Sequence, residues 1–82
     1  MKFLPAGDLA VSVELDETIR VDVNPRIRAL EYLIEQKGVP GVVETVPSFR
    51  ALLVYYNPAL TTYEALGDTL RALAAHTDAA VL

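Results

Sequence analysis

Hydrophobic residues alternate with small or polar residues over Leu9–Leu15, and this period of two predicts a β-strand with one strongly apolar face. The stretch Ala51–Tyr56 has almost no polar interruption, which is typical of a strand in the middle of a sheet. A shorter stretch, Val42–Val46, is followed by Pro47 and contains Glu44, and both features indicate an edge strand. The pattern therefore predicts at least three strands.

A first helix is predicted between the strands at 9–15 and 42–46. Asn24 is a favourable N-cap, Pro25 suits the first helical position, and Gly38 can end the helix in a left-handed conformation. The apolar residues between them fall at helical spacing: Ile27, Leu30, Leu33 and Ile34.

A second helix is predicted after the strand at 51–56. Thr61 as N-cap and Glu64 three residues later fit a capping box. The apolar stripe of this helix consists of Leu66, Leu70, Leu73 and Ala74. We expect His76-Thr77-Asp78 to end the helix and the apolar segment Ala79–Leu82 to begin a last strand.

The element order β-α-β-β-α-β predicts an α+β domain with the ferredoxin-like split β-α-β fold. In this fold a four-stranded antiparallel sheet carries two helices on one face, and the strands at 9–15 and 51–56 are central. Leu52 and Val54 are the alternative to Leu53 in the core, because an all-apolar strand does not show which of its faces is inside. The expected core is Val11, Val13, Ile27, Leu30, Ile34, Leu53, Leu66 and Leu70.

Composition narrows the range of functions. The 82 residues suffice for one domain, and 52% of them are hydrophobic. The net charge of −4 gives no support for binding nucleic acid or an anionic membrane. No cysteine is present, which excludes a disulfide framework and a thiolate metal site. The chain has no apolar run long enough for a membrane span or a secretory signal, so we expect a cytoplasmic protein.

The residues offer no catalytic constellation. His76 is the only histidine, and neither Ser12 nor Ser48 lies in a motif that would pair it with a base. The acidic cluster of Asp16, Glu17 and Asp22 lacks the spacing of a calcium loop and is expected to be solvated. We therefore predict no catalytic, cofactor-binding or metal-binding residue. The segment Arg50–Tyr56 contains an arginine and two tyrosines, but it has few basic neighbours and lacks the glycine of an RNA-recognition motif. It therefore does not predict RNA binding.

The sheet predicts a surface for association. With both helices on one face, the opposite face is uncovered and should pack against another protein surface. Ala10 and Ser12 are expected on this face, and a turn at its rim offers an aromatic residue and an arginine. The predicted partner-binding residues are Phe49, Arg50, Leu52, Val54 and Tyr56.

Three segments resemble one protein family. Gly7–Val13 is similar to its opening strand, "G-D-x-A-(hydrophobic)", and Asn24–Leu30 to its "I-N-x-x-V-x-x-L" helix. Gly41–Pro58 resembles its segment "G-V-x-E-x-V-P-(small)-(aromatic)-x-S-L-x-V-x-Y-D-P". The chain departs from this pattern at Ala51, where Ser or Thr is common, and at Asn57, where Asp is common. The family is that of KipI, the 5-oxoprolinase component PxpB and allophanate hydrolase subunit 1, whose members contain carboxyltransferase subdomains C and D.

The resemblance implies a larger assembly. Members have this N-terminal domain followed by a cyclophilin-like domain, which is absent from these 82 residues. They pair with a KipA/PxpC-like subunit, and the pair is similar to the carboxyltransferase domain of urea carboxylase. Members act in ATP-dependent 5-oxoprolinase, so ATP would concern the full complex and not this domain.

We therefore expect a non-catalytic module of an enzyme complex, with no activity of its own. The alternative implied by the resemblance is a regulatory module that inhibits a sporulation histidine kinase. A stand-alone ligand or RNA binder on the same fold is a third hypothesis, and a homo-oligomer is an alternative way to cover the apolar sheet face.

Overall fold

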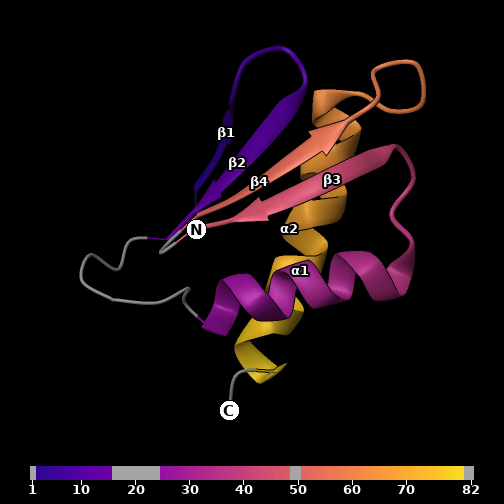
Figure 1. Cartoon of the computed structure of the whole chain (residues 1–82). Coiled ribbons are helices and arrows are strands. Elements are labelled where there is room, and N and C mark those ends of the chain that lie inside the picture. Colours follow the sequence, from indigo (N-terminus) through magenta and orange to yellow (C-terminus); the bar gives the residue numbers. More distant parts are fainter. Residues whose placement is uncertain (1, 16–24, 49–50, 81–82) are drawn as a thin grey trace.

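A computed structural model describes residues 2–15, 25–48 and 51–80, and these ranges contain four strands and two helices (Figure 1). Their bounds, in chain order, are β1 (Lys2–Pro5), β2 (Ala10–Glu14), α1 (Pro25–Lys37), β3 (Val42–Pro47), β4 (Ala51–Tyr56) and α2 (Tyr63–Ala80). The predicted α+β architecture, a four-stranded antiparallel sheet with two helices, is confirmed. None of the helices in these ranges is long and apolar enough to cross a lipid bilayer.

The strands lie side by side in the order β1-β2-β4-β3, and all neighbouring pairs are antiparallel. The two most apolar strands, β2 and β4, are central, as their sequence predicts. In their shared register Val11 lies opposite Val54, and Val13 lies opposite Leu52. Strand β3 forms one edge and has an irregularity between Val42 and Glu44.

The fourth strand is not where the sequence pattern placed it. Ala79 and Ala80 belong to α2, and Val81 and Leu82 lie outside the described residues. The edge position beside β2 is filled instead by β1, which reaches β2 through a short turn where the Ala6 amide donates to the Ala10 carbonyl at 2.9 Å. Because alanine is the best helix former, the alanine-rich segment continues α2 through His76-Thr77-Asp78. The element order is thus β-β-α-β-β-α.

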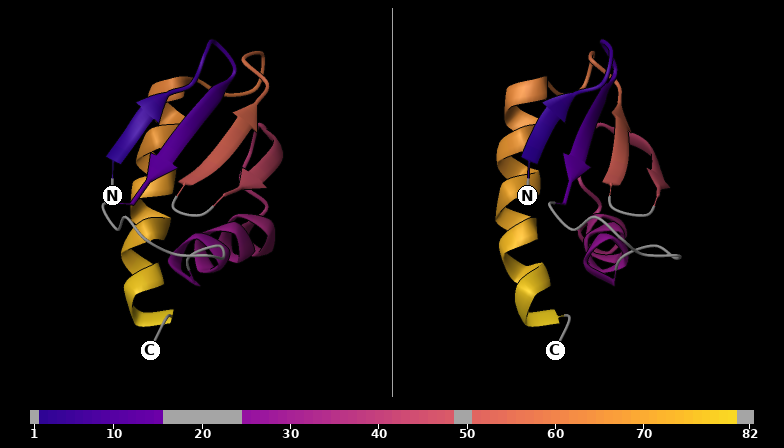
Figure 2. Two further views of the ribbon diagram at one scale, coloured as in Figure 1. Left: turned by 60° about the vertical axis from the view of Figure 1, so that its left-hand side comes forward. Right: turned by 90° about the vertical axis from the view of Figure 1, so that its left-hand side faces the viewer.

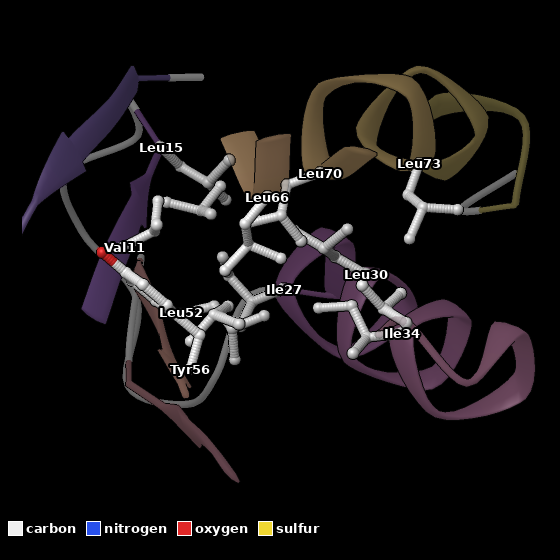
Figure 3. Close-up of a cluster of buried hydrophobic side chains, with 13 residues drawn as sticks. Val11, Leu15, Ile27, Leu30, Ile34, Leu52, Tyr56, Leu66, Leu70 and Leu73 are labelled. Atoms are coloured by element: carbon white, nitrogen blue, oxygen red, sulfur yellow. The ribbon is translucent and has the colours of Figure 1, made fainter. Parts of the chain in front are cut away.

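Both helices cover the same face of the sheet, with α1 against β3 and β4 and α2 against β2 (Figure 2). Between the layers, side chains of Val11, Leu52 and Tyr56 meet those of the two helices (Figure 3). The buried cluster consists of Val11, Val13, Leu15, Ile27, Leu30, Ile34, Val39, Leu52, Val54, Tyr56, Leu66, Leu70 and Leu73.

One predicted core residue is wrong. Leu53 is only half-buried, whereas Leu52 and Val54 are fully buried and take its place. The reason is the register with β2: its valines face the helices, and their cross-strand neighbours on the same face are Leu52 and Val54. The other seven predicted core residues are buried as expected.

Local signals set the ends of the helices. Gly38 has φ of +59°, and Val39 donates its amide to the Ile34 carbonyl at 3.5 Å, which closes α1 in a Schellman motif. At the start of α2, Thr62 rather than Thr61 is the N-cap, because Thr62 Oγ1 accepts a hydrogen bond from the Ala65 amide at 3.1 Å.

Candidate interaction surface

The face of the sheet that points away from the helices, here called the outer face, carries an apolar row across all four strands. Leu4 pairs with Ser12, Ser12 with Leu53, and Leu53 with Val46, so these four residues follow one another from edge to edge. Residues that are paired in this way share one face of a sheet. The row contains three large apolar side chains and one small polar one.

A second row reinforces the apolar character of the outer face. Ala10 pairs with Tyr55, and Tyr55 pairs with Glu44 on β3. A third row, which flanks the first row on the side opposite Ala10 and Tyr55, begins with two charged residues: Lys2 on β1 pairs with Glu14 on β2. The centre is therefore apolar and the margin charged, which is the usual anatomy of a protein interface.

The outer face is accessible along β1, β3 and β4, whereas Ala10 and Ser12 on β2 are buried between their neighbours. Leu4 is 43% exposed, Val46 39% and Tyr55 38%, although all three lie in regular strands of the sheet. Single exposed apolar residues need no explanation, but a contiguous apolar patch marks a site of association. The outer face is the candidate functional site of this domain.

Ser12 lies in the middle of this surface but is buried. The residue is only 7% exposed, and its hydroxyl donates to Glu14 Oε2 at 3.1 Å. Ser48 is exposed beside β3 and donates its hydroxyl to the Ala51 carbonyl at 3.2 Å. His76 is an exposed residue of α2, the helix that covers the opposite face of the sheet. The fold therefore places the histidine in a different layer from Ser12.

The partner-binding residues predicted on β4 have the wrong orientation. Leu52, Val54 and Tyr56 are buried in the core, and the Tyr56 hydroxyl donates to the Asp8 carbonyl at 3.2 Å. Ala10 and Ser12 do lie on the outer face, as expected. Phe49 and Arg50, the predicted rim residues, lie outside the described residues.

Four residues of the outer face were not identified from the sequence: Leu4, Val46, Leu53 and Tyr55. Leu53 and Tyr55 could have been found from the pairing of β4 with β2, which requires knowledge of the register. Leu4 depends on β1, whose four residues give too short a pattern to predict a strand. Val46 could have been recognised, because it alternates with Thr45 and Pro47 along β3.

Among residues 2–15, 25–48 and 51–80, no group of three or more His, Asp or Glu side chains could hold a metal ion. The acidic cluster of Asp16, Glu17 and Asp22 lies outside these ranges. The described part of the chain thus has an apolar outer face and no metal-binding cluster of this kind.

Comparisons with known proteins agree with one another. The family described as "Carboxyltransferase domain, subdomain C and D" matches residues 1–81. A 5-oxoprolinase component of Bacillus subtilis (strain 168), the subunit designated B, is 35% identical over 51 residues, which are 62% of this chain and 21% of that protein. The matched part thus spans about a fifth of the length of this curated relative.

Solved structures contain the same fold. A conserved uncharacterized protein from Pyrococcus horikoshii superposes with a TM-score of 0.83 and 32% identity, over 93% of this chain and 35% of that one. The urea carboxylase of Kluyveromyces lactis superposes with a TM-score of 0.80 over 92% of this chain and 7% of that one. At 24% identity, the second likeness concerns the fold alone.

Proposed function

Because the chain belongs to the family of carboxyltransferase domains, subdomain C and D, we propose that it is a non-catalytic module of a carboxyltransferase-like complex of the 5-oxoprolinase type. The relative from Bacillus subtilis supports this type, since that 5-oxoprolinase component is 35% identical over 51 residues. ATP and 5-oxoproline would then be handled by the full complex, outside this domain.

The observation that carries this proposal is the outer face. Its apolar row of Leu4, Leu53 and Val46 spans the whole width of the sheet, and the two helices occupy the other side. Burial of such a row stabilises an assembly by roughly 25 cal/mol for each Å² of apolar surface removed from water. We propose that the outer face packs against the cyclophilin-like domain of a longer polypeptide or against a KipA/PxpC-like partner subunit.

The proposal is tested by charge substitutions on the outer face. In a polypeptide that joins this domain to the cyclophilin-like domain of a relative, Leu53→Lys combined with Tyr55→Glu should abolish co-elution with the partner subunit in size-exclusion chromatography. Both side chains are at least partly exposed, so far-ultraviolet circular dichroism should stay that of the folded protein.

The chain offers a matched control for this experiment. Leu60 is 69% exposed in the turn before α2, and Tyr32 is 60% exposed on α1, so neither belongs to the outer face. Leu60→Lys combined with Tyr32→Glu makes the same chemical changes and should leave assembly intact. If the outer-face variant assembles as well as the control, the outer face does not bind the partner subunit; unchanged thermal stability of the joined polypeptide as well would show that it does not pack against the cyclophilin-like domain either. Loss of binding to a histidine kinase, with assembly unchanged, would favour the regulatory alternative.

A further inference from the structure

Two opposite charges lie at diagonally opposite corners of the outer face. Lys2 is on the edge strand β1, in the row that it shares with Glu14. Glu44 is on the other edge strand, β3, in the row that it shares with Tyr55. The side chains of Lys2 and Glu44 are exposed, and in the described part of the chain neither of them forms an ion pair. One corner thus carries an unpaired cation and the other an unpaired anion.

The two charges are too far apart to meet within one chain. Lys2 and Glu44 are separated by the three spacings between four adjacent strands, which amount to about 14 Å. The rows that contain them are four residues apart along the strands, which also amounts to about 14 Å. Their diagonal separation is therefore about 20 Å, more than the two side chains can span. The patch between them is nearly as long as it is wide.

A patch of this shape and charge is complementary to a copy of itself. Two sheets can pack face to face with their strands at right angles. A two-fold axis then exchanges the opposite corners of a nearly square patch, so that Lys2 of each copy lies over Glu44 of the other. The same rotation brings Leu4 of each copy toward Tyr55 of the other. With aligned strands and an axis parallel to them, Lys2 would instead lie over the Pro47 end of β3, away from Glu44.

Between the charged corners, the apolar side chains of the two copies would cover each other. Leu4, Val46 and Tyr55 are all exposed in one chain, and their removal from water favours association. The sheet has only four strands of four to six residues. Its face is smaller than the roughly 800 Å² that each partner contributes to a standard protein interface. The pairing of two copies should therefore be weak and reversible.

We propose that two copies of this chain associate through their outer faces when no other protein is present. Their strands cross at about a right angle, and two Lys2–Glu44 ion pairs fix the orientation. The interface is isologous, because the same patch serves on both copies. This inference does not rest on the proposed enzyme complex, since it concerns the chain alone. A partner protein that takes the outer face would displace the second copy.

The test is sedimentation equilibrium of the 82-residue chain over a range of protein concentrations. The parent chain should show a monomer–dimer equilibrium that shifts toward monomer as salt is added. Lys2→Glu and Glu44→Lys should each weaken the dimer by about tenfold or more, because two attractive contacts become repulsive. An equal mixture of these two variants should associate again, because each mixed dimer has opposite charges at both corners.

Two control variants reverse charges on the other side of the sheet. Arg28→Glu and Glu35→Lys change exposed residues of α1, which packs against the opposite face, and should leave the dimer unchanged. The proposal is overturned if the parent chain stays monomeric up to about 1 mM, or if the controls weaken association equally. It is also overturned if the mixture of Lys2→Glu and Glu44→Lys associates no better than each variant alone. These outcomes leave the test of the partner subunit unaffected.

Discussion

Gly41 lies so close to Thr61 that a β-carbon added at residue 41 would be 2.5 Å from Thr61 Cγ2. The contact joins the start of β3 to the segment before α2, and it is supported by the Asn57 amide, which donates to the Gly41 carbonyl at 2.8 Å. Gly41 also has φ of +84°, a conformation that other residues rarely adopt.

Gly41→Ala should therefore lower the free energy of unfolding by about 3 kcal/mol or more, because backbone strain and a steric clash act together. Gly38→Ala is the control: its φ is +59°, but no atom lies within 4 Å of the added carbon. This variant should lose only about 1 kcal/mol. Urea unfolding measures the free energy of unfolding of each variant. If the two variants lose the same amount of stability, the close contact at Gly41 is contradicted.

Leu52 and Leu53 are neighbours on β4 with opposite orientations. Leu52→Ala leaves a cavity in the core and should destabilise the protein by about 2–5 kcal/mol. Leu53→Ala removes a half-buried side chain from the outer face and should cost about 1 kcal/mol or less. Thermal or urea unfolding measures the stability of the two variants. If Leu53→Ala were the more destabilised, Leu53 and not Leu52 would face the helices.

Thr62 should contribute to stability through its side-chain oxygen. Thr62→Ala removes the acceptor for the Ala65 amide and should cost about 1 kcal/mol of unfolding free energy. Thr62→Asp retains an acceptor in the same place and should stay within a few tenths of a kcal/mol of the parent. Equal destabilisation by the two changes would show that the threonine methyl group, not the cap, matters here.

The domain alone should have no 5-oxoprolinase activity. Ser48 donates its hydroxyl to a backbone carbonyl, and Ser12 donates to Glu14, so neither hydroxyl is paired with a histidine base in the described part of the chain. Incubation of the purified chain with 5-oxoproline and ATP should release neither glutamate nor phosphate above background. Turnover that disappears in His76→Ala or Ser48→Ala would contradict the non-catalytic role.

The central part of the fold could be predicted because its signals are local. Strand β2 alternates strictly, β4 is almost wholly apolar, and α1 begins at a proline and ends at a left-handed glycine. The C-terminal part of α2 could not be predicted with the same rules. Its polar break was expected to end the helix, but alanines on both sides of it favour continuation.

The candidate site was predicted as a face but not as a set of residues. That an uncovered sheet face exists follows from two helices on one side. Which side chains of β4 belong to it depends on its register with β2, and Tyr55 and Tyr56 are equally suited to either face. Strand β1 completes the apolar row, yet it is held by contacts with distant residues, such as the Tyr63 hydroxyl, which donates to the Phe3 carbonyl at 3.2 Å.

The pairing of β2 with β4 has a consequence for synthesis on the ribosome. Strand β2 is made before α1 and β3, whereas its central neighbour β4 is made after them. Until then β1 and β2 can form only a two-stranded hairpin, which is marginal in water. Joining distant segments slows folding, since the intervening chain must be ordered before the pairing stabilises it. The first strands to be made must therefore wait for the last one before the sheet can form.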